Sequence, residues 1–198
     1  PVLVTGAGRG IGKRLAMGFA NNGARVGLLA RSKPELDLCQ LEIEHAGGNA
    51  LRIRADVSDY EQVSAAVERM RVQFGSPVQV LVCAAAIQGP IGPFVDTTPK
   101  MWNETIHTNL LGVMNVCRAV LPGMIQRRKG KIIVLTSGAG SQARPNLAIY
   151  AATKAAVVSF VESVADEVRD HNVQINCMAP GATYTSMTDE VLRAGEVA

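Results

Sequence analysis

The chain has 198 residues and a formal net charge of +3, with 47% hydrophobic and 19% charged residues. This length predicts one domain whose core needs no disulfide or metal to hold it together. The charge is too small and too scattered to indicate a nucleic-acid partner. The sequence also lacks a run of about 18 apolar residues, so we expect no membrane span.

Strand-like and helix-like segments alternate along the chain. The expected strands are residues 2–5, 25–30, 50–54, 78–84, 131–136 and 173–178, and the expected helices are residues 11–22, 33–46, 59–74, 100–128 and 147–170. Short apolar strands separated by helices of about ten or more residues predict βαβ units. The predicted fold class is α/β, a single domain (1–198) with a doubly wound parallel sheet and helices on both faces. Residues 181–198 have weak periodicity, and we expect a mobile flap on the substrate side.

A glycine-rich loop joins the first expected strand to the first expected helix. Its sequence is Thr5-Gly6-Ala7-Gly8-Arg9-Gly10-Ile11-Gly12. Gly6, Gly10 and Gly12 would carry the turn, since glycine lets a ligand approach the backbone without meeting a Cβ atom. The helix N-terminus that follows offers unpaired N–H groups to an anion. The loop therefore predicts a site for a nucleotide cofactor, with a plain strand–helix connection as the alternative.

The second expected strand ends in Leu29-Ala30-Arg31-Ser32, without the acidic residue that binds the ribose 2′-hydroxyl of NAD in dinucleotide folds. A guanidinium matches a phosphate in charge and geometry, and Arg9 can reach the same 2′-phosphate as Arg31. The pair favours NADP(H), with NAD(H) possible; for each arginine alone, a surface role is the alternative. Asp56, after the third strand, is placed to accept from the adenine amino group or to cap a helix.

The candidate chemistry lies later in the chain. Tyr150 and Lys154 are four residues apart in an expected helix and so lie on one face. An ammonium near a phenol favours the phenolate, so such a tyrosine can exchange a proton with a carbonyl or alcohol. Ser137 ends a strand, and the turn at 138–140 lets it share a substrate oxygen with Tyr150. The alternatives are a surface tyrosine–lysine pair and a serine that only ends a strand.

The spacing of the cysteines and histidines indicates the redox state of the thiols and whether a metal site is expected. The four cysteines are far apart, with no C-x-x-C pair: Cys39, Cys83, Cys117 and Cys177. Two lie inside apolar runs, which indicates reduced core thiols in a cytoplasmic protein. The three histidines lack the spacing of metal ligands, so we expect no metal site.

The chain resembles the short-chain dehydrogenase/reductase family over nearly its whole length. The matching residues are Thr5-Gly6-x-x-x-Gly10-Ile11-Gly12, Asp56-Val57, Asn109, Ser137, Tyr150-x-x-x-Lys154 and Asn176-x-x-x-Pro180-Gly181. The resemblance implies a Rossmann-like oxidoreductase that uses NADP(H) to interconvert a ketone and a secondary alcohol by hydride transfer. It also implies a homodimer or homotetramer formed through the helices at 100–128 and 147–170.

By similarity, Tyr150 is the general acid/base, and Ser137 orients and polarises the carbonyl. Lys154 binds the nicotinamide ribose and lowers the pKa of the tyrosine. Asn109 holds a water that joins Lys154 to solvent, unless it only breaks the long helix. The cofactor-binding residues implied are Thr5, Gly6, Arg9, Gly10, Ile11, Gly12, Arg31, Asp56, Val57, Ala84, Ala85, Ala86, Tyr150, Lys154, Pro180, Gly181 and Thr185.

Two features depart from the family pattern. Cys83-Ala84-Ala85-Ala86 stands where the family usually has Asn-Asn-Ala-Gly, so we expect an asparagine tie between strands to be lost and Ala86 to tighten the adenosine ribose site. Family members usually continue through another helix and a seventh strand, which we expect this chain to lack.

The expected substrate pocket comes from residues 88–94, 138–144 and 184–187. Apolar side chains mix there with Gln142 and Arg144, which suits a mostly apolar ketone or alcohol with one polar end. One alternative is a reductase of carrier-bound 3-oxoacyl chains, with the basic run 127–129 facing an acidic carrier. Another is a regulatory or scaffold protein that binds NADP(H) without turnover.

Overall fold

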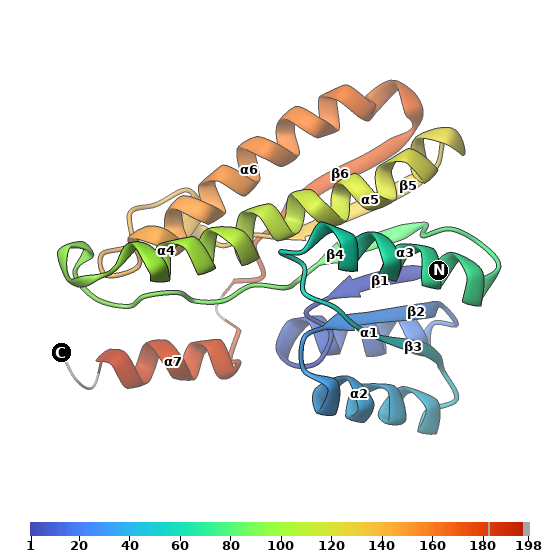
Figure 1. The fold of residues 1–198 in the computed structure, drawn as a ribbon, viewed down its shortest axis with the longest axis horizontal. Coiled ribbons are helices and arrows are strands. Elements are labelled where there is room, and N and C mark those ends of the chain that lie inside the picture. The colour runs from blue at the N-terminus through green and yellow to red at the C-terminus, as the bar shows by residue number, and fades with distance from the viewer. Residues whose placement is uncertain (182, 196–198) are drawn as a thin grey trace.

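A parallel sheet is the centre of the fold. The computed structural model describes residues 1–181 and 183–195, and Figure 1 shows the sheet with helices on both sides. The six strands are all parallel: β1 (Val2–Thr5), β2 (Arg25–Ala30), β3 (Asn49–Arg54), β4 (Val80–Cys83), β5 (Gly130–Leu135) and β6 (Val173–Met178). They lie in the order β3-β2-β1-β4-β5-β6. This is the strand order of the Rossmann fold, so the predicted α/β class with a doubly wound sheet is confirmed.

The helices form two layers that cover the two faces of the sheet. One layer holds α1 (Gly10–Asn21) and α2 (Lys33–His45). The other holds α3 (Tyr60–Phe74), α5 (Gly112–Gln126) and α6 (Ala148–Val168). The central strands are apolar at consecutive positions because both of their faces are buried. In β1, for example, Val2 and Val4 pack with the first layer and Leu3 packs with the second.

The predicted helix over 100–128 has a break in the middle. It consists of α4 (Pro99–Ile106), a π-helical segment (His107–Leu111) and α5. Asn109 lies in the π-helical segment and is completely buried. A π-helical turn inside a longer helix is often found at a functional site.

A helix that the sequence did not predict lies near the C-terminus. α7 (Ser186–Gly195) occupies most of the segment expected to be a flap, and Figure 1 shows it beside the sheet and away from both helix layers. Residues 182 and 196–198 of that expected flap are outside the described residues. The mobility of the segment stays a prediction.

Two helical stretches are long and apolar enough to pass a membrane-span criterion: Pro99–Gln126 and Ala148–His171. Both supply side chains to the buried core against the sheet, including Val116, Cys117, Val157 and Val161. Core helices commonly pass the same criterion, so these two stretches are weak evidence for membrane association.

Candidate active site

The glycine-rich loop lies at the carboxyl end of β1, where the strand order reverses. Ligands of open α/β sheets bind in this crevice. Gly6 and Gly10 have φ angles of 65° and 56°, in the left-handed region that favours glycine. A Cβ atom at Gly6 would lie 2.8 Å from the backbone of Ala85, and one at Gly12 would overlap the carbonyl oxygen of Gly6. The loop therefore presents bare backbone at the crevice, as a bound pyrophosphate requires.

Thr5 lies beneath the loop and ties two strands together. Its Oγ1 accepts hydrogen bonds from the backbone N–H groups of Ala84 (3.1 Å) and Ala85 (3.2 Å). This contact joins β1 to the segment after β4, where the family's asparagine tie was expected to be lost. The sequence pattern marked Thr5 as a cofactor-site residue, whereas its side chain is 1% exposed and shapes the loop from below.

A cleft of about 360 Å³ runs from the glycine loop to the start of α6. This size is within the usual range of small-molecule sites. Most of the predicted cofactor residues line it: Gly6, Arg9, Gly10, Ile11, Gly12, Arg31, Asp56, Val57, Ala84, Ala85, Ala86, Tyr150, Lys154, Pro180 and Thr185. The cleft lining does not include Thr5, Asn109, Ser137 or Gly181. Residues that line it without having been predicted to bind are Gly8, Leu29, Ala30, Ser32, Glu35, Ala55, Ile87, Thr108, Leu135 and Thr136.

Two ion pairs occupy the end of the cleft beside β2 and β3. Arg9 Nη1 lies 4.0 Å from Glu35 Oε1, and Arg31 Nη1 lies 3.8 Å from Asp56 Oδ2. Asp56 Oδ1 also accepts from the backbone N–H (2.9 Å) and hydroxyl (2.8 Å) of Ser58. The cap of α3 is Asp59, whose side chain accepts from Gln62 N–H, so Asp56 does not fill the capping role considered above.

Lys154 is the most deeply buried charged group of the site. It is 4% exposed, and its Nζ donates a 2.9 Å hydrogen bond to the carbonyl oxygen of Leu135 at the end of β5. Burial lowers the pKa of Lys154 to about 8 because desolvation disfavours the charged form. Its Nζ also lies 5.6 Å from the centre of the Tyr150 ring, as expected for two residues one helical turn apart.

Ser137 lies beside Tyr150, although Ser137 itself is not part of the cleft lining. Ser137 follows β5 and begins a short 3₁₀ turn, Gly138–Gly140, which packs closely on α6: a Cβ atom at Gly140 would lie 3.0 Å from the backbone of Lys154. Burial raises the pKa of Tyr150, while a hydrogen bond with Ser137 acts in the opposite direction. The expectation that Lys154 lowers this pKa differs from the arrangement seen here, since its ammonium lies over the ring and bonds to Leu135.

Asn109 connects three segments behind the candidate catalytic residues. Its Oδ1 accepts from Ile87 N–H (2.8 Å), and its Nδ2 donates to the Ile87 carbonyl (2.9 Å) and to Thr153 Oγ1 (3.3 Å). The amide thus joins the π-helical segment to the loop after β4 and to α6. The expected break in the helix is present, and the side chain also has a positioning role that the sequence pattern did not indicate.

The expected substrate pocket is only partly assembled. Of its residues, Thr185, Ser186 and Met187 line the cleft together with the cofactor set. Phe94 is 52% exposed and stacks on Trp102 with ring centres 5.0 Å apart, and Tyr184 is 75% exposed. Arg144 is an exposed side chain near Gly138, outside the cleft lining.

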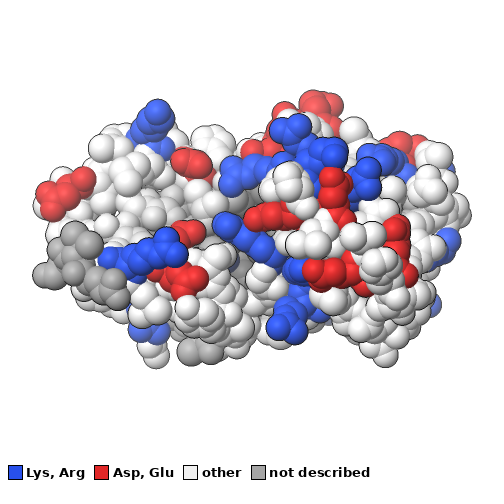
Figure 2. Space-filling model, turned by 90° about the horizontal axis from the view of Figure 1, so that it is seen from below, with Lys and Arg blue, Asp and Glu red and all other residues white. Residues whose placement is uncertain are grey.

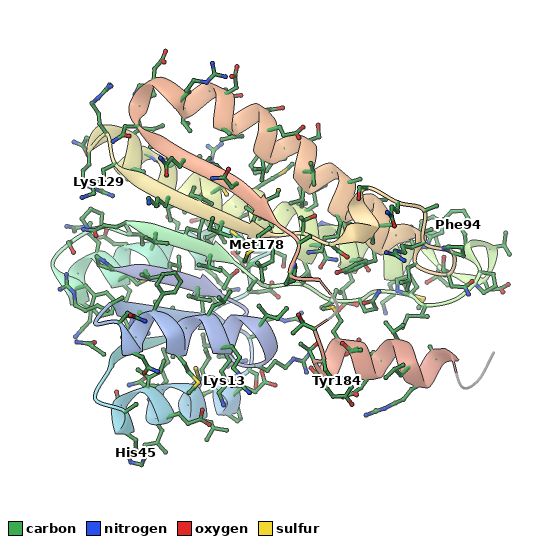
Figure 3. All side chains as sticks on the ribbon, turned by 180° about the vertical axis from the view of Figure 1, so that it is seen from behind. Lys13, His45, Phe94, Lys129, Met178 and Tyr184 are labelled. Atoms are coloured by element: carbon green, nitrogen blue, oxygen red, sulfur yellow. The ribbon has the colours of Figure 1, made fainter. Side chains whose placement is uncertain are left out.

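The basic run 127–129 lies at the amino ends of the strands, opposite the end of the sheet that holds the cleft. Arg127 donates to the carbonyl oxygen of Val78, and Arg128 donates to that of Asp170, both near the amino ends of strands. Figure 3 shows Lys129 at the far end of the molecule from Phe94 and Tyr184. Among the described residues, no three His, Cys, Asp or Glu side chains gather into a possible metal site.

Comparison with known proteins places this architecture in a family. A family model described as "short chain dehydrogenase" matches residues 1–195. A 3-oxoacyl-[acyl-carrier-protein] reductase of Staphylococcus aureus is 37% identical over 94% of this chain and 76% of its own.

Two solved structures have the same fold. A 3-ketoacyl-ACP reductase of Sinorhizobium meliloti has a TM-score of 0.87 and 39% identity, over 92% of this chain and 72% of its own. A gluconate 5-dehydrogenase of Burkholderia cenocepacia, in complex with NADP and tartrate, has a TM-score of 0.90 and 33% identity, over 96% and 74%. The chain therefore belongs to the short-chain dehydrogenase/reductase family and is an oxidoreductase of that family.

Proposed function

We propose that this protein uses NADP(H) to interconvert a ketone and a secondary alcohol, with Tyr150 as the general acid/base. The observation that carries the proposal is the convergence of Tyr150, Ser137 and Lys154 at one end of a cleft whose other end is the glycine loop. One end suits a dinucleotide phosphate, and the other suits proton transfer.

The residues present fit a nicotinamide dinucleotide. A Cβ atom at Gly6 or Gly12 would clash with neighbouring backbone, so only glycine lets the loop take this shape. The loop lines the cleft at Gly6, Gly10 and Gly12, where a pyrophosphate would bind. Arg9 and Arg31 would bind a 2′-phosphate, Asp56 the adenine, and Lys154 the nicotinamide ribose. When bound, the cofactor supplies the carbon that gives or takes a hydride. The Burkholderia relative was solved in complex with NADP, which supports this assignment.

Reduction of a carbonyl requires Tyr150 in its protonated form. A buried phenol whose pKa is raised stays protonated at neutral pH, so it can donate its proton to a carbonyl oxygen as that oxygen gains charge. Ser137 would donate a second hydrogen bond to the same oxygen and hold it in place. The Lys154 ammonium and the Asn109 network behind it would return a proton to Tyr150 after each cycle.

The identity of the carbonyl substrate has two candidates. We favour a small free ketone with one polar end. The gluconate 5-dehydrogenase of Burkholderia supports a free substrate over a carrier-linked one. A carrier-linked 3-oxoacyl chain is the second candidate, supported by the reductases of Staphylococcus and Sinorhizobium. The basic run 127–129 does not favour the second candidate, because its arginines bond to backbone at the edge away from the cleft.

A regulatory protein without turnover is a weaker proposal. The buried lysine and the serine–tyrosine contact would be costly features in a protein that only bound the cofactor.

We also propose a cytoplasmic location, consistent with four free cysteines. We further propose a homodimer or homotetramer through α5 and α6. Only 22% of the apolar window in Ala148–His171 is buried within one chain, so a second copy would cover apolar residues of α6. Light scattering of the purified protein tests the assembly.

The experiment that tests the function is NADPH-linked reduction over a panel of free ketones, oxo acids and carrier-linked 3-oxoacyl chains. We expect turnover with at least one class and its loss in Tyr150→Phe. Tyr60→Phe is the matched control, because Tyr60 lies on α3 under Arg118 and away from the cleft. Equal NADPH oxidation by wild type and Tyr150→Phe would contradict the role given to Tyr150, and cofactor binding without turnover on any substrate would favour the regulatory alternative.

A further inference from the structure

The end of the cleft that would hold the adenosine contains balanced charges. Arg9 faces Glu35, and Arg31 faces Asp56, so two positive and two negative groups lie together. Figure 2 shows acidic and basic side chains interspersed over the α1–α2 side of the described surface. A 2′-phosphate bound here would lie beside these two ion pairs and not in a region of net positive charge. The carboxylates therefore influence how strongly the arginines can bind it.

The two carboxylates are held differently. Two hydrogen bonds from Ser58 fix the carboxylate of Asp56 in place. Glu35 accepts no hydrogen bond from the described residues, and its ion pair with Arg9 is long and half exposed. It nevertheless lines the cleft, and a Cβ atom at Gly8 would lie 2.8 Å from its Oε2. Glu35 is thus the carboxylate that lies directly against the phosphate-binding loop and is free to adjust.

A purely structural role does not account for this position. Ser32 and Glu35 have the spacing of a capping box, in which the serine and the glutamate bond to backbone N–H groups at the start of a helix. At the start of α2, Ser32 makes no side-chain capping bond. The Glu35 carboxylate points instead to Gly8 and Arg9. Both side chains line the cleft, where a cofactor phosphate can meet them.

We propose that Glu35 sets the balance between NADP(H) and NAD(H), an inference that rests on the proposed function. Its carboxylate competes with the 2′-phosphate for Arg9 and repels the phosphate directly. NAD(H) has a hydroxyl at that position and does not meet this repulsion. The result is a protein whose preference for NADP(H) is modest and which also uses NAD(H).

The test measures binding and needs no turnover. Adenosine 2′,5′-bisphosphate and AMP are titrated by calorimetry, and NADPH and NADH by fluorescence, into wild type and Glu35→Gln. We expect Glu35→Gln to bind the bisphosphate and NADPH about three- to tenfold more tightly, and AMP and NADH within about twofold of wild type. The gain shrinks in high salt because the groups are partly exposed.

Two further variants isolate the mechanism. Glu44→Gln removes the same charge from the exposed end of α2 and leaves all four affinities unchanged. In an Arg9→Gln background, Glu35→Gln has a smaller effect, since the two residues act through one contact. An unchanged NADPH-to-NADH ratio in Glu35→Gln overturns this inference alone. Failure of wild type to bind either cofactor overturns the proposed function, and the inference with it.

Discussion

The two ends of the cleft are built in different ways. At the catalytic end, Lys154 and Asn109 are almost fully buried and bond to backbone carbonyl and N–H groups. At the adenosine end, Arg9 and Arg31 are more than half exposed and make ion pairs near 4 Å with carboxylates. Buried polar groups have no water to replace a lost partner, whereas exposed ion pairs are screened and worth little. Chemistry is thus fixed at one end, and cofactor choice is adjustable at the other.

The largest effect that sharpens this contrast is expected for Lys154→Met. The thioether keeps the volume but cannot donate to Leu135, to a ribose or to the proton path of Tyr150. We expect NADPH-linked reduction to fall by about 10² to 10⁴-fold. Steady-state kinetics measures the loss, with Lys131→Met on the exposed side of β5 as the control. A decrease of less than tenfold would mean that Lys154 has only a structural role.

At the adenosine end, Arg31→Asp removes a phosphate partner and adds repulsion. The ratio of kcat/KM for NADPH to that for NADH is expected to fall about 100-fold, while activity with NADH persists. Activity with NADH should persist because the exposed adenosine end of the cleft, unlike the buried end at Lys154, tolerates a change of charge. Arg69→Asp, an exposed residue of α3, is the control for net charge. An unchanged ratio would exclude Arg31 from the cofactor site.

The buried lysine also predicts how stability depends on pH. The pKa of Lys154 is lowered to about 8 in the folded protein from 10.5. Between these values the unfolded chain binds the proton and the folded one does not, so stability rises with pH. Below pH 8 both forms are protonated, and the full cost of the buried ammonium remains.

Urea unfolding measures this dependence. From about pH 7.5 to 9.5, wild type should gain about 2 kcal/mol relative to Lys154→Met. The window stays below the ordinary pKa of tyrosine, which avoids the opposite effect of Tyr150, whose raised pKa costs stability at higher pH. If the free energies of unfolding of wild type and Lys154→Met changed in parallel with pH, Lys154 would not be desolvated in solution.

The same contrast explains what could be predicted from the sequence. The sheet and glycine loop were predictable because strand–helix alternation and bare backbone at Gly6 and Gly12 are local properties of the chain. The proximity of Tyr150, Lys154 and Ser137 was predictable because the first two share one helix face and Ser137 follows closely after β5.

Other features depend on contacts between distant segments. Thr5 reaches across to the N–H groups after β4, and Asn109 bonds to Ile87 and Thr153. Glu35 was not among the predicted site residues. It lies in the cleft against Gly8, where a Cβ atom would come within 2.8 Å of its Oε2. The pKa of Tyr150 was expected to be lowered by its lysine neighbour, but burial, which spacing in one helix does not reveal, raises it.

The smallest effect is expected at the basic run, away from both ends of the cleft. Ser137 is eight positions beyond Lys129 along nearly extended chain, so these two residues lie about 25 Å apart. The double variant Arg128→Gln/Lys129→Gln should change KM for a carrier-linked 3-oxoacyl substrate by less than about twofold. It loses the bond from Arg128 to Asp170, which stands on the surface and contributes little. A large rise in KM for the carrier-linked substrate, with no change for a free ketone, would instead place a carrier on this edge and favour the second candidate substrate.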